Sequence, residues 1–157
     1  MYPYFQRKPA PNLQSRETAP SDPLRDFLTE NPFFGTLLFQ VTGGQGAFPI
    51  AGAQVVITKD LTDGHAFSIT TTTDESGKTE EFSLPAPDKS LSQTPEGRNV
   101  YATYDATISA PGYVAVVVND IPIFDGITTI QPVRMSPDFS GQRAGERETI
   151  EDTEPNL

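Results

Sequence analysis

Four carboxylates in two acidic segments are the residues of this sequence whose types could bind a metal. Asp60 and Asp63 lie in DLTDG, and Asp74 and Glu75 lie in TDESG. Calcium takes roughly six to eight oxygen ligands, which clustered carboxylates could supply. Neither segment has the alternating acidic spacing of an EF-hand loop. We therefore favour a solvated rim of a β-structure over a calcium site, and we expect no other cofactor.

The other candidates for catalysis lack the partners that catalysis requires. Glu80 and Glu81 are adjacent in a predicted strand, so they point to opposite faces and cannot act together as a glycosidase pair. His65 is the only histidine, and it falls in the predicted turn TDGHAF, so one chain cannot assemble a Ser-His-Asp triad there. The chain has no cysteine, which removes thiolate nucleophiles and disulfides. We expect that the protein is not an enzyme.

The segment TDESGKTEEFSL has the residues of a tight turn. Asp74 and Ser76 can accept local backbone hydrogen bonds, and Gly77 permits a positive φ. The sequence therefore predicts a hairpin between two strands at this point.

The composition indicates one domain whose partners are neither nucleic acid nor lipid. The chain has 157 residues, a formal net charge of −10, 15 prolines and 12 glycines. A chain this acidic is repelled by nucleic acid and by anionic membranes. The N-terminal sequence MYPYFQRKPAPNL has no apolar run of signal-peptide length, and no segment is apolar and long enough for membrane insertion. On these grounds alone we expect a cytoplasmic protein.

Three zones are expected along the chain. Residues 1–34 form an arm that contains one short helix, and residues 136–157 form an acidic tail that is expected to be disordered. Between them, residues 35–135 alternate apolar and polar residues with the period of β-strands. The helix is predicted at about 21–31, with Ser21 as its cap. Its apolar face consists of Leu24, Phe27 and Leu28.

The middle zone reads as an antiparallel β-sandwich of about seven short strands. GTLLFQVT places Leu37, Phe39 and Val41 on one face, and GYVAVVVND is apolar enough to be buried on both faces. Turn signals such as TGGQG, DESG, APG and NDIP separate the strands. The fold class is therefore all-β, with a short N-terminal helix and flexible termini.

Several apolar residues are candidates for partner binding. The aromatic arm cannot bury its own rings, so it either adds as a strand to a neighbouring subunit or folds back on its own domain. The segment NDIPIFDGI packs in the core or at a subunit contact, and the loop 84–99 either recognises a partner or only crosses between sheets. The candidate residues are Tyr2, Tyr4, Phe5, Phe33, Phe34, Ile121, Ile123 and Phe124.

The order of several motifs resembles the carboxypeptidase regulatory-like domains. FPIAGAQVVIT, TTTDESG and YDATISAPGY match the family's P-x-x-G-A-x-V, T-D-x-x-G and Y-x-v-x-a-x-G-Y elements. The resemblance implies a transthyretin-like or immunoglobulin-like sandwich. The matching residues are Pro49, Gly52, Ala53, Val55, Thr73, Asp74, Gly77, Tyr104, Ala110, Gly112 and Tyr113.

Longer blocks, including LPAPDKSLS and IPIFDGITTIQPV, resemble a bacterial subgroup labelled spore cortex-lytic protein. That resemblance implies a structural or adaptor protein of the spore or cell envelope of a spore-forming bacterium. Its implied partners are envelope proteins, further copies of the chain, or peptidoglycan. Two alternatives stay open. One is a self-assembling subunit of a surface filament or sheath that uses its aromatic arm, and the other is an accessory module of a cortex-lytic hydrolase.

Overall fold

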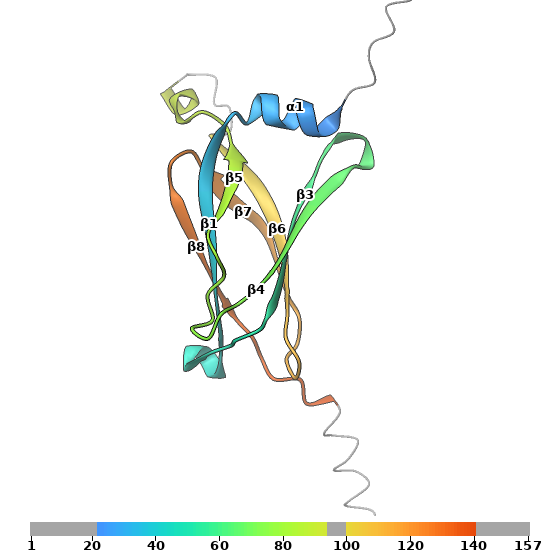
Figure 1. Ribbon diagram of the computed structural model, residues 1–157, viewed down its shortest axis with the longest axis vertical. Coiled ribbons are helices and arrows are strands. Elements are labelled where there is room, and N and C mark those ends of the chain that lie inside the picture. The colour runs from blue at the N-terminus through green and yellow to red at the C-terminus, as the bar shows by residue number, and fades with distance from the viewer. Residues whose placement is uncertain (1–21, 94–99, 141–157) are drawn as a thin grey trace, which may run out of the picture.

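The computed structural model describes residues 22–93 and 100–140, which form a β-sandwich with one helix across one end (Figure 1). The predicted all-β fold is confirmed. Predictions for Tyr2, Tyr4, Phe5 and Ser21 concern residues outside this range, as do those for the tail beyond residue 140.

Sheet A is built around the long strand β1 (Phe33–Gly43), which begins two residues before the predicted domain boundary. On one side β1 pairs antiparallel with β5 (Phe82–Ala86) and, at its end, with β2 (Phe48–Pro49). On the other side it pairs with β8 (Thr128–Arg134) in parallel. This parallel pair departs from the expected antiparallel pattern. It arises because β8 follows directly on a strand of the opposite sheet and crosses over to β1.

Sheet B contains four antiparallel strands in the order β4-β3-β6-β7. The two central strands are β3 and β6, and β4 and β7 lie at the edges. The bounds are β3 (Gln54–Asp60), β4 (Ala66–Thr72), β6 (Tyr101–Ser109) and β7 (Val116–Phe124). Short 3-10 turns also occur at Gly44–Gly46, Thr62–Gly64 and Lys89–Gln93.

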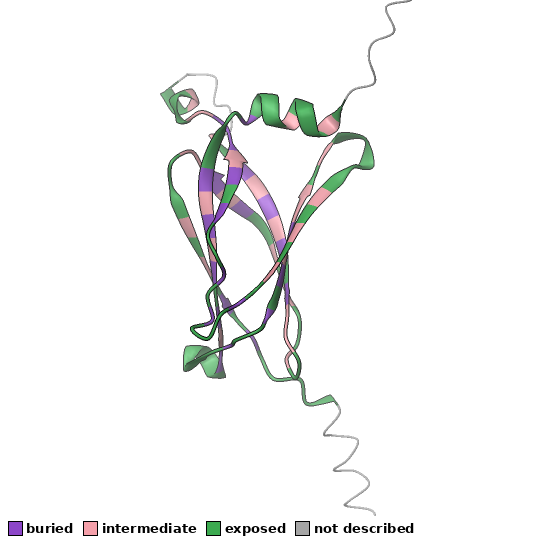
Figure 2. Ribbon diagram, viewed as in Figure 1, coloured by how far each residue is buried: buried purple, intermediate pink, exposed green. Residues whose placement is uncertain are grey.

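The core lies between the two sheets and follows the predicted alternation. Leu37, Phe39 and Val41 are fully buried on the inner face of β1, and the intervening residues are more exposed. Because successive side chains on a strand point to opposite faces, each strand contributes every second residue to the core. Figure 2 shows the buried residues gathered on the strands, with the helix largely exposed.

Strand β7 is less buried than the sequence predicts, and it begins and ends four residues later. The expectation that GYVAVVVND is buried on both faces is wrong, because Val114 and Val117 are exposed. Because sheet B packs on the core with one face only, the outer face of β7 is open to solvent. The turn predicted at NDIP is also absent from the described chain. Asp120 instead adopts φ 57° and donates its backbone N–H to Asp105 Oδ1 (2.9 Å), and the strand continues past this irregularity.

The first residues of the predicted tail are part of the sandwich. Val114 N–H donates to Ser136 O, and Asp138 N–H donates to Gly112 O, both at 2.9 Å. The predicted domain boundary at residue 135 is therefore too early. These backbone hydrogen bonds hold residues 136–138 beside the turn between β6 and β7.

The acidic turn after β4 has the predicted local hydrogen bonds but the wrong predicted topology. Asp74 Oδ1 accepts from the Ser76 hydroxyl (2.6 Å), Ser76 N–H (2.9 Å) and Lys78 N–H (3.0 Å), and these bonds hold the pKa of Asp74 below its usual value. Gly77 has φ 75°, as expected. The turn is not a hairpin, however, because β4 and β5 lie in different sheets. It carries the chain from sheet B to sheet A.

Candidate functional site

Helix α1 (Pro23–Glu30) is shorter than predicted and is capped by a different residue. Asp22 is the N-cap, and its carboxylate accepts two backbone N–H groups of the first turn at 3.1 and 3.3 Å. The predicted cap Ser21 lies just outside the described residues. At the other end, the backbone and side-chain N–H groups of Asn31 both donate to Phe27 O at 2.9 Å.

The helix contacts the sandwich through the side chain of Phe27. This ring packs against Phe67 and Tyr104, with ring centroids 6.1 and 6.4 Å apart. Lys59 lies over the rings of Phe27 and Tyr104. Its Nζ is 5.5 Å from the ring centroid of Phe27 and 5.6 Å from the ring centroid of Tyr104. Its ammonium donates to Thr103 O at 2.7 Å. A half-buried aromatic cluster therefore fixes α1 across the end of sheet B.

Tyr104 also ties this cluster to the other sheet. Its hydroxyl donates to Pro85 O in β5 at 2.6 Å. Burial raises the pKa of the Tyr104 hydroxyl, so the group stays a neutral donor at any physiological pH. The end of the sandwich below α1 is thus held by packing and by a hydrogen bond between sheets A and B.

The predicted apolar face of α1 is only partly buried. Phe27 packs inward as expected, but Leu24 and Leu28 are exposed. Of the three residues of this face, only Phe27 therefore packs against the core of the sandwich.

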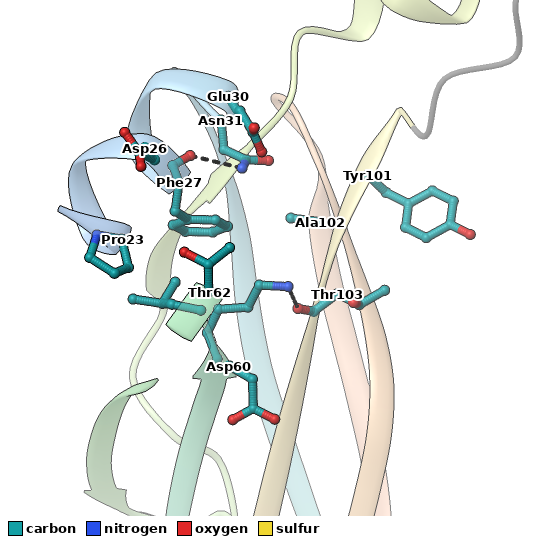
Figure 3. Close-up of a pocket in the computed structure, with 12 residues that line it drawn as sticks. Pro23, Asp26, Phe27, Glu30, Asn31, Asp60, Thr62, Tyr101, Ala102 and Thr103 are labelled. Atoms are coloured by element: carbon teal, nitrogen blue, oxygen red, sulfur yellow. Dashed lines mark hydrogen bonds between the residues drawn. The ribbon is translucent and has the colours of Figure 1, made fainter. Parts of the chain in front are cut away.

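A cleft of about 440 Å³ lies between α1 and the ends of β3 and β6. Asp26, Glu30 and Asp60 contribute carboxylates to its lining, but Figure 3 shows the Asp60 carboxylate and the Tyr101 ring directed away from Phe27. No group of three or more metal-ligating side chains is present among residues 22–93 and 100–140. The acidic groups therefore line the rim of the cleft without converging on one point.

A second feature is an apolar patch on the solvent-facing side of sheet A. We define the sheet A patch as Phe34, Leu38 and Ile130, which lie on the outward-facing positions of β1 and β8. Leu38 and Ile130 are register partners across β1 and β8. The start of β1 binds the turn before β8 by two backbone hydrogen bonds of 2.9 Å, from Gly126 N–H to Phe34 O and from residue 36 N–H to Ile127 O. The patch is thus continuous across the two strands.

The exposure of the patch is high for apolar side chains. Phe34 and Ile130 each expose more than half of their surface, and Leu38 is half-buried. The outward-facing residues next to the patch carry no charge, and the first charge along β8 is Arg134. These neighbours are Thr36, Gln40, Thr128 and Pro132. Clustered apolar side chains that face water are typical of an interaction surface, whereas scattered ones are not.

The predicted partner contacts divide between surface and core. Phe33 and Phe34 are exposed at the start of β1. Ile121 and Ile123 are 1% and 0% exposed, so the assignment of these two as partner contacts is corrected to core residues. Phe124 is half-buried and packs against Tyr101, with ring centroids 5.4 Å apart.

The four calcium candidates do not come together. Asp60 and Asp63 lie at the turn between β3 and β4, and Asp74 and Glu75 follow the opposite end of β4. A strand of seven residues separates the two pairs, and the Asp74 Oδ1 atom already accepts three hydrogen bonds. The described acids therefore give no shared cation site. His65 is exposed at the same turn as Asp63, in line with the expected turn position.

Sequence reasoning missed Leu38 and Ile130. A signal was present, because Leu38 follows the inward-facing Leu37 and so breaks the alternation of β1 with an apolar residue on the outer face. Ile130 likewise lies on the outer face of β8, out of phase with the buried Val133. An apolar residue out of phase with the core pattern is therefore a marker for this surface.

Comparisons with known proteins do not assign the chain to a family. A scan against models of protein families gives no match, and neither does a search of curated proteins. Among solved structures, the chain is similar to the Bacillus anthracis TIE protein (19% identity, TM-score 0.46), covering 67% of this chain and 17% of that one. The resemblance to carboxypeptidase regulatory-like domains thus remains one of sequence motifs.

Two dioxygenases show comparable similarity. They are 3-chlorocatechol 1,2-dioxygenase from Rhodococcus opacus 1CP (14% identity, TM-score 0.45) and catechol 1,2-dioxygenase from Pseudomonas arvilla C-1 (16% identity, TM-score 0.46). The matches cover 66% and 70% of this chain, and 61% and 54% of those chains. The chain therefore spans less than two thirds of each of these structures. As for membranes, α1 is the sole α-helix of the described part, and it is too short to span a bilayer.

Proposed function

We propose that this chain is a non-enzymatic structural or adaptor protein that docks a protein partner on the sheet A patch. The observation that supports this function is the patch itself, in which large apolar side chains gather on an uncharged stretch of β1 and β8. Transfer of such side chains from water into an interface is favourable, at roughly 25 cal/mol per Å² of apolar surface. The motif resemblance suggests the spore or cell envelope as the location of the partner.

The test is a single charge placed in the patch. In full-length protein, Ile130→Lys should lower the fraction that sediments with isolated spore envelopes by about tenfold or more, because a lysine cannot be desolvated in an apolar interface. Val117→Lys is the matched control, since Val117 faces solvent on the edge strand of the other sheet and is similarly exposed (61% against 57%). Circular dichroism of both variants checks that the fold is retained.

Each outcome decides one part of the proposal. If the wild-type protein stays in the supernatant, the proposed envelope function is contradicted. If the Ile130→Lys variant sediments with envelopes as the wild type does, the sheet A patch is not the docking surface. Binding to purified peptidoglycan that matches binding to whole envelopes would replace the protein partner by a glycan.

A second candidate function is a self-assembling subunit that uses its N-terminal arm for strand addition. It is favoured by the open edges of both sheets in the described chain and by the aromatic residues Tyr2, Tyr4 and Phe5. We expect the molar mass from light scattering to rise above the 17.1 kDa of one chain as concentration increases. A full-length Phe5→Pro variant, which removes a ladder donor, should shift that rise to higher concentration. A constant mass of one chain would contradict this function.

A further inference from the structure

One edge strand of the sandwich lacks the features that usually protect such strands. Exposed edges are normally guarded by proline, charged residues or bulges against pairing with another chain. The edges of the described sheets are formed by β2, β4, β5, β7 and β8. Proline occurs in four of them, at Pro49, Pro85, Pro122 and Pro132. The fifth, β4, has the sequence AFSITTT, without proline or charge, and its pairing with β3 has no register shift.

The hydrogen-bond pattern shows which backbone groups of β4 face outward. Leu61 N–H donates to His65 O, and Thr73 N–H donates to Ala53 O, so the odd-numbered residues of this segment face β3. Because bonding alternates along an antiparallel pair, the N–H and C=O groups of the even-numbered residues point away from β3. Within the described chain no further strand lies on that side. These outward residues are Ala66, Ser68, Thr70 and Thr72.

Charge at the two ends of β4 favours a basic occupant. Asp60 and Asp63 lie before the strand, and Asp74 and Glu75 lie after it. If β4 of a second copy paired antiparallel with this strand, the start of one β4 would lie beside the end of the other. The Asp60 and Asp63 turn of one copy would then lie next to the Asp74 and Glu75 turn of the other copy. That like-charge contact is unfavourable. An extended segment with positive charge would instead be attracted to these acidic turns.

The N-terminal arm of the chain contains such a segment. Residues 1–21 have three basic residues and one acidic residue, in a chain whose net charge is −10. The stretch Tyr4–Lys8, with sequence YFQRK, lies between Pro3 and Pro9 and is itself free of proline. It combines two aromatic residues, which suit β-strands, with Arg7 and Lys8.

We propose that Tyr4–Lys8 of the same chain adds to β4 as a fifth, antiparallel strand of sheet B. The origin of the arm lies at the correct end of β4, because Pro23 and Thr62 line the same cleft (Figure 3). Residues 9–21 can span up to about 40 Å, whereas seven strand residues span about 23 Å. In the antiparallel direction, Arg7 and Lys8 lie at the Ala66 end of the strand, next to Asp60 and Asp63.

This inference goes beyond the sheet A patch and does not depend on it. It assigns an occupant to a different edge and makes the arm a guard against uncontrolled pairing of β4. A tethered segment competes at a high effective concentration, so the chain's own arm is favoured over that of a second copy in dilute solution. Exchange of arms between copies would preserve the same contacts at high concentration.

Residue-resolved amide hydrogen exchange on the full-length chain tests the proposal. At concentrations where light scattering gives the mass of one chain, the outward amides of Ser68 and Thr70 should exchange slowly. Adjacent residues of a strand direct their N–H groups to opposite sides, so the Phe5→Pro/Gln6→Pro variant removes one backbone donor of the arm on each side. This variant should speed the exchange of the Ser68 and Thr70 amides by about tenfold or more. The amides of Phe67 and Ile69, which face β3, serve as an internal control and should not change.

A matched control variant tests whether Tyr4–Lys8 is the segment that covers β4. Leu13→Pro/Gln14→Pro places the same two prolines in the arm outside Tyr4–Lys8 and should leave Ser68 and Thr70 protected. Loss of protection in that variant instead would assign a different segment. Fast exchange of both amides in the unaltered chain would show that no strand covers β4. Protection that appears only as the mass grows would assign the arm of a second copy and support the self-assembling function.

Discussion

Thr73→Val should lower the free energy of unfolding by about 2–5 kcal/mol, although the two side chains have nearly the same shape. The Thr73 hydroxyl donates to Ile50 O at 2.6 Å and accepts from Ala53 N–H at 2.9 Å, and the residue is buried. Valine would leave two backbone polar groups without their partner in a water-poor site, and each such group costs about 1–3 kcal/mol. The measurement is urea unfolding followed by circular dichroism.

The neighbouring Thr72→Val is the control for this prediction. Thr72 is exposed at the end of β4, so valine there should change stability by less than about 0.5 kcal/mol. Equal loss in both variants would mean that the cost comes from the β-branched apolar side chain itself and not from the buried hydrogen bonds. Threonine at the first position of the T-D-x-x-G motif is therefore explained by two hydrogen bonds that join the turn to the segment before β3.

Gly35→Ala should destabilise the fold by about 3 kcal/mol, a large effect for one added methyl group. A Cβ at this buried position of β1 would lie 2.7 Å from Ile123 Cγ2 and against the carbonyl oxygen of Phe124. That oxygen belongs to the backbone at the end of β7, so it can move only if the strand moves. Urea unfolding should therefore show a lower midpoint with an unchanged slope.

Gly43→Ala separates this steric effect from the general cost of replacing a strand glycine. Gly43 also faces inward on β1 and has an ordinary extended backbone, with φ −116°. The two nearest atoms that its Cβ would meet belong to the exposed side chain of Phe48, which can rotate away, and the third is Ile50 Cδ1 at 3.2 Å, the end of a side chain that has to shift only slightly. We expect a change of less than about 1 kcal/mol there. Comparable losses at both glycines would contradict the proposed contact between β1 and β7.

The contacts of Gly35 and Thr73 both help to close the sandwich around its core. Gly35 lets β1 approach the end of β7, and Thr73 joins the turn after β4 to the chain before β3. Neither contact is local in sequence. The β1 and β7 contact joins segments about ninety residues apart, and this separation is why no short motif predicts it.

Local pattern was sufficient for the strands and for the chemistry of the acidic turn. The alternation in GTLLFQVT predicts the buried Leu37, Phe39 and Val41 because side-chain direction in a strand has a period of two. The hydrogen bonds of Asp74 also follow from neighbouring residues. By contrast, the local sequence of this turn predicts a hairpin, and that prediction is wrong because a turn sequence does not specify which strands pair on either side.

The sequence by itself determined the all-β class, the inner face of β1 and the aromatic, basic composition of the arm. Only the tertiary structure decided that β8 runs parallel to β1, that Ile121 and Ile123 are core, and that Leu38 and Ile130 meet on an exposed face. The physical reason is that strand period is a local property, whereas strand order and register depend on contacts between distant segments. The open edge of β4 belongs to this second group, because an edge exists only once the order of strands is fixed.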